Sequence, residues 1–312
     1  MTLHHLYGVI KVIRLTRRQF GKATAATTAA LALFGTKAIA EPSSIQYVKF
    51  PDGSHAPALG QGTFRLAEGR RPAEQEESAL KTGIALGMTL LDTAEMYGDG
   101  SAEAMIGRVI AGERKNVYLV SKVLPYHATA QGIRKACNAS LSRMGTQYLD
   151  LFLLHWRDSS TDLKEVVNTF EELRQSGQIR RWGVSNFEIS DLEELFAIPG
   201  GEQCVTNQVR YSLMDRNIEQ DLIPWCEKHG LPIMAYSPLG KGSLLKNDTL
   251  ISVATRLKCT PAAVAIAWTM RNGETISIPS AGSSEHVKEN AKALSLKLTI
   301  DDLRELDKAF PI

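Results

Sequence analysis

The most constraining feature of this chain is a regular alternation, from Leu59 onward, of short β-rich runs with longer stretches of helical periodicity. Such an alternation predicts βαβ units and a parallel sheet. Eight units can be counted, which favours an α/β fold of the (β/α)8 TIM barrel type in a single domain. The expected strands are residues 59–62, 89–93, 117–122, 149–155, 181–185, 206–209, 233–236 and 276–279.

The expected helices lie between these strands, and glycines mark where many of them end. Five helical stretches are followed by such a glycine shortly before the next strand, namely Gly87, Gly145, Gly177, Gly230 and Gly273. Glycine is favoured there because the residue that ends a helix often takes a positive φ. The expected helices include residues 72–86, 102–111, 128–144, 163–176, 218–229, 261–272 and 300–309.

Residues 45–58, ahead of the first unit, have the pattern of a β-hairpin. Apolar residues flank the run Pro51-Asp52-Gly53, whose composition is typical of a tight turn. We expect this hairpin to cap the bottom of the barrel.

The first forty residues differ from the rest of the chain. They contain six Lys and Arg residues and no acidic residue, so the net charge of +2 becomes −4 for residues 41–312. The run Thr16-Arg17-Arg18-Gln19-Phe20-Gly21-Lys22 resembles a twin-arginine export signal, and it is followed by an Ala- and Thr-rich apolar stretch and then Ala38-Ile39-Ala40. We therefore expect a signal peptide at residues 1–40, export by the twin-arginine machinery to the periplasm, and a mature domain at residues 41–312.

Two alternatives for this segment are a short membrane anchor and a disordered tail. The apolar stretch, residues 23–34, is shorter than the roughly 20 residues that a spanning helix needs. The mildly acidic body gives no sign of nucleic-acid binding.

The four cysteines, Cys137, Cys204, Cys226 and Cys259, form no Cys-x-x-Cys pair, so no metal site is expected. Buried thiols are the favoured reading of these cysteines, and a disulfide remains open.

Four polar side chains stand at or just beyond the predicted ends of three consecutive strands. Asp92 ends the second strand, and Tyr97 lies in the loop that follows it. Lys122 ends the third strand, and His155 ends the fourth. In barrels of this type the active site forms at these ends. Each residue alone is readily explained as a loop contact or a packed core residue, but the four together match the needs of carbonyl reduction.

When hydride reaches a carbonyl carbon, charge develops on the oxygen, which then needs hydrogen-bond donors and finally a proton. We expect Tyr97 to donate the proton and His155 to be the second donor to the oxygen. Because a phenol with a pKa near ~10 is a weak acid, Lys122 is expected to stabilise the phenolate form and Asp92 to hold Lys122 in place.

The runs around these four residues resemble the catalytic motifs of the aldo-keto reductase family, and the resemblance covers about residues 45 to 310. It implies an NAD(P)H-dependent oxidoreductase that reduces aldehydes or ketones to alcohols. The catalytic motifs are Leu91-Asp92-Thr93-Ala94-Glu95-Met96-Tyr97-Gly98, Ser121-Lys122 and Leu154-His155-Trp156. Further matches are Pro57-Ala58-Leu59-Gly60-Gln61-Gly62-Thr63, Gly183-Val184-Ser185-Asn186-Phe187, Asn207-Gln208-Val209 and Tyr236-Ser237-Pro238-Leu239-Gly240.

The same resemblance implies a cofactor that lies extended across the barrel mouth. The residues assigned to the nicotinamide are Ser185, Asn186 and Gln208 for the carboxamide and Tyr236 for the ring face. For Tyr236, ordinary packing at a strand end is the alternative. The residues assigned to the pyrophosphate are Ser237, Leu239 and Gly240, and those assigned to the adenine are Glu289 and Asn290.

The adenosine end departs from the family pattern. Members that prefer NADP(H) usually carry Lys at the position of Ser280 and Arg at the position of His286. In their absence Ser280, Ser283 and the N-terminus of the following helix are expected to bind a 2′-phosphate, with Lys288 assisting. NADP(H) is therefore favoured as cofactor, while NAD(H) or dual use remains open.

The expected wall of the substrate pocket consists of Phe64, Met96 and Trp156. Since the chain ends at Ile312, soon after its last predicted helix, we expect an open pocket for small aldehydes and ketones. We also expect a monomer.

Two other functional classes were weighed against a reductase. A redox-sensing partner protein that binds the cofactor with little turnover would not need the acid and its supporting pair. A metal-dependent barrel hydrolase would need clustered ligands, and no His-x-His occurs at the first strand.

Overall fold

The structure, a computed structural model, describes residues 45–312. The predicted signal peptide at residues 1–40 lies outside the described residues. Eight parallel strands form one sheet in sequential order. They are β3 (Gly60–Gly62), β4 (Leu90–Asp92), β5 (Tyr118–Val123), β6 (Leu151–Leu154), β7 (Trp182–Ser185), β8 (Asn207–Arg210), β9 (Ile233–Tyr236) and β10 (Thr275–Ile278).

The sheet closes on itself between its first and last strands. The backbone N–H of Gly62 donates to the carbonyl of Pro279 at 3.0 Å, and that of Ser277 donates to the carbonyl of Ala58 at 2.7 Å. Closure removes the unpaired edges that an open sheet would expose. The predicted (β/α)8 barrel is confirmed, with each predicted strand within a few residues of its observed bounds.

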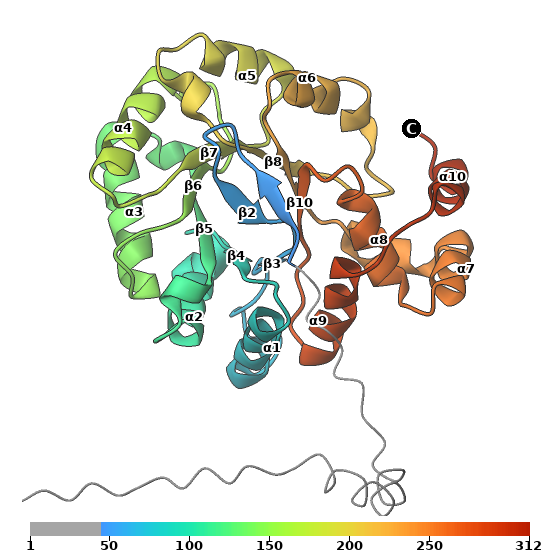
Figure 1. Cartoon of the computed structure of the whole chain (residues 1–312). Coiled ribbons are helices and arrows are strands. Elements are labelled where there is room, and N and C mark those ends of the chain that lie inside the picture. The colour runs from blue at the N-terminus through green and yellow to red at the C-terminus, as the bar shows by residue number, and fades with distance from the viewer. Residues whose placement is uncertain (1–44) are drawn as a thin grey trace, which may run out of the picture. The chain divides into compact units, whose positions relative to one another are not determined.

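Helices form a ring around the strands (Figure 1). They are α1 (Ala73–Ala85), α2 (Ser101–Val109), α3 (Ala130–Met144), α4 (Leu163–Gln175), α5 (Ile189–Phe196), α6 (Leu222–Lys228), α7 (Asp248–Arg256), α8 (Pro261–Thr269), α9 (Ser284–Ala291) and α10 (Ile300–Ala309). The five glycines expected after helices all have positive φ, from +61° at Gly145 to +95° at Gly87. These helix ends are therefore confirmed.

One predicted helix is too long in the sequence-based assignment. The stretch 218–229 contains a short 3₁₀ turn, Asn217–Glu219, and α6 begins only at Leu222. The reason is local, because the Asp221 carboxylate accepts a hydrogen bond from the Leu222 N–H at 2.6 Å and caps the helix there. Two short helices, α5 and α7, lie outside the expected segments.

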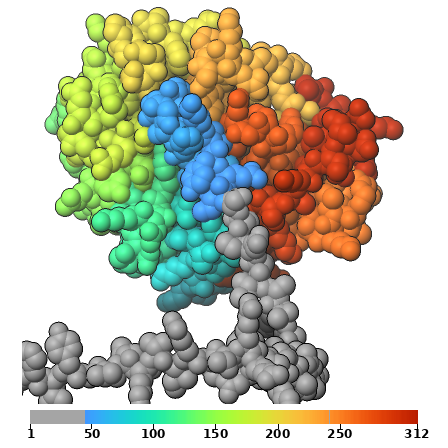
Figure 2. Space-filling view, viewed as in Figure 1, coloured from blue at the N-terminus to red at the C-terminus, as the bar shows by residue number. Residues whose placement is uncertain are grey.

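The N-terminal hairpin consists of β1 (Tyr47–Lys49) and β2 (His55–Pro57), which pair antiparallel. Val48 and Ala56 are buried in the same cluster as Leu151 and other residues of the barrel strands. Figure 1 shows the hairpin across one end of the barrel, and Figure 2 shows its atoms filling the centre of that face. The predicted cap is confirmed, and it leaves the opposite end of the barrel for the site.

The four cysteines are free, and three of them, Cys137, Cys204 and Cys226, are buried. The prediction of buried thiols therefore holds for these three, and Cys259 is partly exposed. Among residues 45–312, no single helix is long and apolar enough to cross a bilayer. Helices α7 and α8 together have the length and composition, but they are bent by 94° at the break between them.

Gly83 of α1 packs directly on the buried side chain of Gln61. The Gln61 amide donates to the carbonyls of Leu80 and Met88, at 3.1 and 2.9 Å, which holds it in place. A Cβ at position 83 would lie 2.1 Å from Oε1 of Gln61. We predict that Gly83→Ala lowers the free energy of unfolding by about 1–3 kcal/mol, although alanine is the better helix former. Denaturant titration measures this loss.

A double variant supplies the control for this clash. Gln61→Ala alone removes two hydrogen bonds, and adding Gly83→Ala to it should cost less than Gly83→Ala costs in the wild type, because the two side chains no longer collide. Additive losses, or a more stable Gly83→Ala variant, would show that the contact does not constrain α1.

Candidate active site

The four polar side chains expected to form the site meet at one end of the barrel. Asp92 is the last residue of β4, and Lys122 is next to last in β5. His155 follows β6, and Tyr97 begins the 3₁₀ turn η1 (Tyr97–Gly100) that follows β4. Since parallel strands place their carboxyl ends at one edge, neighbouring strands bring these groups together.

Asp92, Tyr97 and His155 line a cavity of about 380 Å³. The three predicted substrate residues, Phe64, Met96 and Trp156, line the same cavity. The ring of Phe64 packs edge to face on that of Tyr97, with 5.3 Å between centroids. The sequence therefore predicted both polar and apolar residues that line this cavity.

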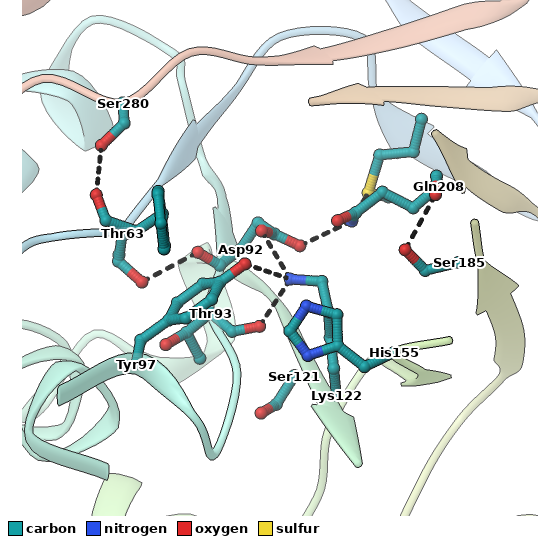
Figure 3. Close-up of polar contacts among 12 residues, drawn as sticks. Thr63, Asp92, Thr93, Tyr97, Ser121, Lys122, His155, Ser185, Gln208 and Ser280 are labelled. Carbon is teal, nitrogen blue, oxygen red and sulfur yellow. Dashed lines mark hydrogen bonds and ion pairs between the residues drawn. The ribbon is translucent and has the colours of Figure 1, made fainter. Parts of the chain in front are cut away.

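Lys122 and Asp92 form an ion pair that is almost completely removed from water. The Lys122 Nζ lies 2.8 Å from the Asp92 Oδ2, and the two residues are 0% and 2% exposed. The ammonium also donates to the backbone carbonyl of Thr93 at 2.8 Å and lies 3.5 Å from the Tyr97 hydroxyl (Figure 3). A buried ammonium is tolerated only with such partners, so these contacts fix where Lys122 points.

Burial and neighbouring charge act in opposite directions on the two groups. Although burial alone would lower the pKa of Lys122, the contacts with Asp92 and Tyr97 raise it above its ordinary value. Burial raises the pKa of Tyr97 and outweighs the Lys122 charge, which acts to lower it. Lys122 therefore stabilises the phenolate as expected, but burial leaves the pKa of Tyr97 above its ordinary value. Tyr97 keeps its proton at neutral pH, which suits a proton donor.

His155 is held neutral. Burial and the positive charge of Lys122 together lower the pKa of this imidazole to about 3. Its Nδ1 is buried without a hydrogen-bond partner, so Nε2 is the nitrogen that remains for a ligand in the cavity. A neutral imidazole with its proton on Nε2 can donate to a carbonyl oxygen without adding a charge.

The residues assigned to the nicotinamide form one hydrogen-bonded group. The Ser185 hydroxyl donates to the backbone carbonyl of Gln208 at 2.8 Å, and the Asn186 side-chain amide donates to Ser185 Oγ at 3.0 Å. The Tyr236 hydroxyl donates to Asn186 Oδ1 at 2.9 Å. All four residues line the cavity that contains Tyr97.

The Gln208 side-chain amide also makes a contact that the sequence did not indicate. It donates to Asp92 Oδ1 at 2.8 Å and thereby joins the nicotinamide group to the buried ion pair. Its amide nitrogen is therefore engaged within the protein. The side-chain carbonyl remains as the acceptor that a carboxamide NH₂ requires.

Two of the expected cofactor residues have a backbone conformation that is uncommon for side chains other than glycine. The φ angles are +60° at Asn186 and +54° at Ser237. Such residues persist where surrounding contacts hold them, and they concentrate at functional sites. The half-buried ring of Tyr236, hydrogen-bonded to Asn186, and the polar groups around it fit a nicotinamide ring with its carboxamide.

The remaining predicted cofactor residues are distributed less closely. Ser237 and Ser280 line the cavity. Leu239 and Gly240 lie in the turn beyond β9, where the Gly240 N–H donates to the Ser237 carbonyl at 3.0 Å. The other four, Ser283, His286, Glu289 and Asn290, belong to the start and body of α9 and do not line the cavity, and Asn290 is 2% exposed.

Arg210 is a lining residue that the sequence reasoning missed. Its Nε lies 3.1 Å from Asp215 Oδ2, and Tyr236 is its neighbour in the register of β8 and β9. The sequence could have indicated this position, because side chains alternate between the two faces of a strand and Arg210 therefore shares a face of β8 with Gln208. The guanidinium brings a positive charge to the edge of the cavity.

Comparison with known proteins identifies the family. The sequence profile of the "Aldo/keto reductase family" matches residues 58–310. The methylglyoxal reductase YeaE of Escherichia coli (strain K12) is 45% identical over 269 residues, covering 85% of this chain and 94% of that protein. An uncharacterized oxidoreductase of Bacillus subtilis, YtbE, is 33% identical over 82% of this chain and 90% of its own length.

Solved structures agree with the sequence relatives. An aldo/keto reductase from Klebsiella pneumoniae, in complex with NADP and acetate, superimposes with a TM-score of 0.82 at 43% identity, covering 86% of this chain and 96% of its own. The thermostable aldo-keto reductase Tm1743, in complex with the inhibitor epalrestat, gives a TM-score of 0.78 at 36% identity over 84% and 99% of the two chains. This chain therefore belongs to the aldo/keto reductase family.

Proposed function

We propose that this protein reduces small aldehydes and ketones with NADPH, and that 2-oxoaldehydes such as methylglyoxal are its main substrate class. The chain is an NAD(P)H-dependent oxidoreductase of the aldo/keto reductase family. The observation that carries the assignment is the buried Asp92–Lys122 pair beside the hydroxyl of Tyr97, in one cavity with His155.

The bound nicotinamide supplies hydride to the substrate carbon, and the protein residues act on the oxygen. His155 donates a hydrogen bond from Nε2 and orients the carbonyl. Tyr97 transfers its phenolic proton to the oxygen as negative charge develops there. The phenolate that remains lies 3.5 Å from the Lys122 ammonium, which stabilises it until a proton returns from solvent.

The substrate class is supported by the relatives and by the size of the cavity. Two of the relatives named methylglyoxal reductase, from Escherichia coli, are 45% and 31% identical to this chain. A cavity of about 380 Å³ that also receives a nicotinamide ring leaves room for a few non-hydrogen atoms. Phe64, Met96 and Trp156 add apolar surface beside the reacting oxygen.

NADP(H) is supported as cofactor by the Klebsiella structures with NADP and NADPH, which are 43% identical to this chain. Nothing among residues 45–312 gathers three or more His, Cys, Asp or Glu side chains at a possible metal site. The proton donor Tyr97 and its supporting Asp92–Lys122 pair favour turnover over a role as a redox-sensing binding partner.

Export is a separate part of the proposal. The twin-arginine run, the apolar stretch and Ala38-Ile39-Ala40 support a signal peptide at residues 1–40 and a periplasmic enzyme of residues 41–312. We also propose that this enzyme acts as a monomer. The twin-arginine route transports folded proteins, so an enzyme that binds its cofactor before export suits this route.

Replacing the acid tests the catalytic assignment. In Tyr97→Phe the proton donor is lost while the cavity keeps its shape, so we predict that turnover falls by several orders of magnitude and that the dissociation constant for NADPH changes little. NADPH oxidation with methylglyoxal and other aldehydes measures the first quantity, and fluorescence titration measures the second. Tyr126→Phe is the matched control, because this tyrosine is 66% exposed and outside the cavity.

Two results would contradict the function. Equal losses of binding and turnover in Tyr97→Phe would show that the acid is another residue. A wild-type protein that binds NADPH but reduces no carbonyl compound would favour the binding-partner alternative.

The pH dependence follows from the directions of the two pKa shifts. Because the pKa of Tyr97 is raised, the donor is present at neutral pH and is lost only as pH rises through that raised value. His155, with its pKa lowered from 6.5 to about 3, is already neutral and adds no titration near neutrality. We therefore predict that kcat/KM for reduction is level from about pH 5 to about pH 9. A rise or fall centred near pH 6.5 that disappears in His155→Asn would refute this.

The export proposal predicts that the paired arginines are required. Full-length chains carrying both Arg17→Lys and Arg18→Lys should stay in the cytoplasm, because the machinery reads the arginines and not their charge. Immunoblots and NADPH oxidation in periplasmic and cytoplasmic fractions measure the distribution. Arg14→Lys, outside the motif, is the control, and unimpaired export of the double variant would end the twin-arginine assignment.

A further inference from the structure

The structure shows a cation in an unexpected place near the start of α9. Ser280 and His286 occupy the positions where the family resemblance leads one to expect Lys and Arg. A phosphate monoester is nevertheless bound most strongly by guanidinium or ammonium groups. If this chain prefers NADP(H), a cation from another part of the fold is needed.

Arg71, in the loop between β3 and α1, lies directly against Gly282. A Cβ built at Gly282 would be 2.9 Å from Nη1 of Arg71 and 3.2 Å from its Cδ. Because glycine has no side chain, the guanidinium can reach the backbone just before Ser283, the N-cap of α9. The cation is thus brought to this position by tertiary contact and not by its place in the sequence.

The loop that carries Arg71 is attached at several points. The Ala67 N–H of the loop donates to Oε2 of the buried Glu76, in α1, at 2.8 Å. The Ser280 hydroxyl donates to the Phe64 carbonyl at 3.1 Å, which joins the start of the loop to the segment ahead of α9. These contacts hold the loop close to α9 without using the guanidinium itself.

Helices α1 and α9 are also joined directly. The Thr82 hydroxyl donates to Ser284 Oγ at 3.0 Å, and the Ser78 and Ser284 hydroxyls are 3.4 Å apart. The N-terminus of α9 therefore has a fixed position relative to the base of the Arg71 loop. Small shifts of one helix would carry the other with it.

The charge of Arg71 is not used elsewhere in the described part of the chain. Its neighbour Arg70 has Glu68 at 3.5 Å, whereas no carboxylate among residues 45–312 lies within 4.0 Å of the Arg71 nitrogens. The buried Glu76 lines a cavity of about 370 Å³ together with Arg71 but makes no ion pair with it. Arg71 is exposed, so a soluble anion can reach it.

The chain segment that lines the cavity continues directly to the contact between Gly282 and Arg71. Ser280 lines the wall of the cavity that contains Tyr236, and Gly282 follows two residues later. A dinucleotide whose nicotinamide occupies the cavity must extend its far end across the rim. On this side the rim presents the start of α9, where Ser283 Oγ caps the His286 N–H at 3.3 Å, and just before it the guanidinium of Arg71 against Gly282.

We propose that Arg71 binds the 2′-phosphate of NADP(H) against Gly282 and the start of α9, and so gives this enzyme its preference for the phosphorylated cofactor. The inference rests on the proposed function, since it assumes a nicotinamide dinucleotide in the cavity. It assigns the selectivity to a residue from the first βα loop of the barrel, which compensates for the serine at position 280 and the histidine at position 286.

The test compares two cofactors and two neighbouring arginines. Dissociation constants for NADPH and NADH are measured by fluorescence titration on wild type, Arg71→Gln and Arg70→Gln. Arg71→Gln should weaken NADPH by about tenfold or more, as expected for a lost charge-assisted contact, and should leave NADH within about twofold. Arg70→Gln, which removes an exposed cation from the same loop, should behave as wild type.

Competition with 2′-AMP and 5′-AMP locates the contact independently of the nicotinamide. Wild type should bind 2′-AMP more tightly than 5′-AMP, and Arg71→Gln should abolish that difference. Thermal unfolding of each variant checks that the fold is retained. Arg71→Lys, which keeps the charge, should restore part of the NADPH affinity.

The outcomes separate the inference from the proposed function. Unchanged NADPH affinity in Arg71→Gln would overturn the inference, with Lys288→Gln then identifying the remaining cation on α9. Equal weakening of NADPH and NADH would also overturn it, because the loop would then act on the whole cofactor. A wild-type protein that binds neither cofactor would overturn the proposed function as well.

Discussion

The site depends on one interaction, the ion pair between Lys122 and Asp92 inside the barrel mouth. Both charges are removed from water, so each must be satisfied by the protein, and breaking such a pair typically costs about 3–5 kcal/mol. The network joins three strands, β4, β5 and β8, since the Gln208 amide binds the second carboxylate oxygen and the Thr93 carbonyl, just beyond β4, accepts from the ammonium. The position of Tyr97 relative to a fixed cation follows from this network.

The barrel separates the parts that give stability from those that give chemistry. At one end the hairpin of β1 and β2 covers the strand starts with apolar side chains such as Val48. At the other end the strands finish in polar residues that would be costly to bury without partners. Asn186 and Ser237, which both have uncommon φ angles, lie at this second end, where hydrogen bonds with Gln208 and Tyr236 hold Asn186.

The electrostatics of the site favour reduction in a specific way. Tyr97 keeps its proton because burial outweighs the nearby ammonium, and His155 stays neutral because burial and that same ammonium both disfavour a second positive charge. One cation therefore has two effects, since it stabilises the phenolate after proton transfer and prevents protonation of the imidazole. In the proposed reaction, two donors of different kinds would then act on one carbonyl oxygen.

The sequence by itself determined the barrel, the hairpin, the helix ends and the four polar residues that meet at the barrel mouth, because strand periodicity, turn composition and positive-φ glycines such as Gly145 are local signals. It also predicted the nicotinamide residues through motifs that lie at strand ends. Only the tertiary structure decided the direction of the Tyr97 pKa shift, the contact of Gln208 with Asp92, the place of Arg210 in the cavity wall and the contact of Arg71 with Gly282. Each of these depends on burial or on side chains from segments far apart in the sequence, and no local pattern records which distant groups will meet.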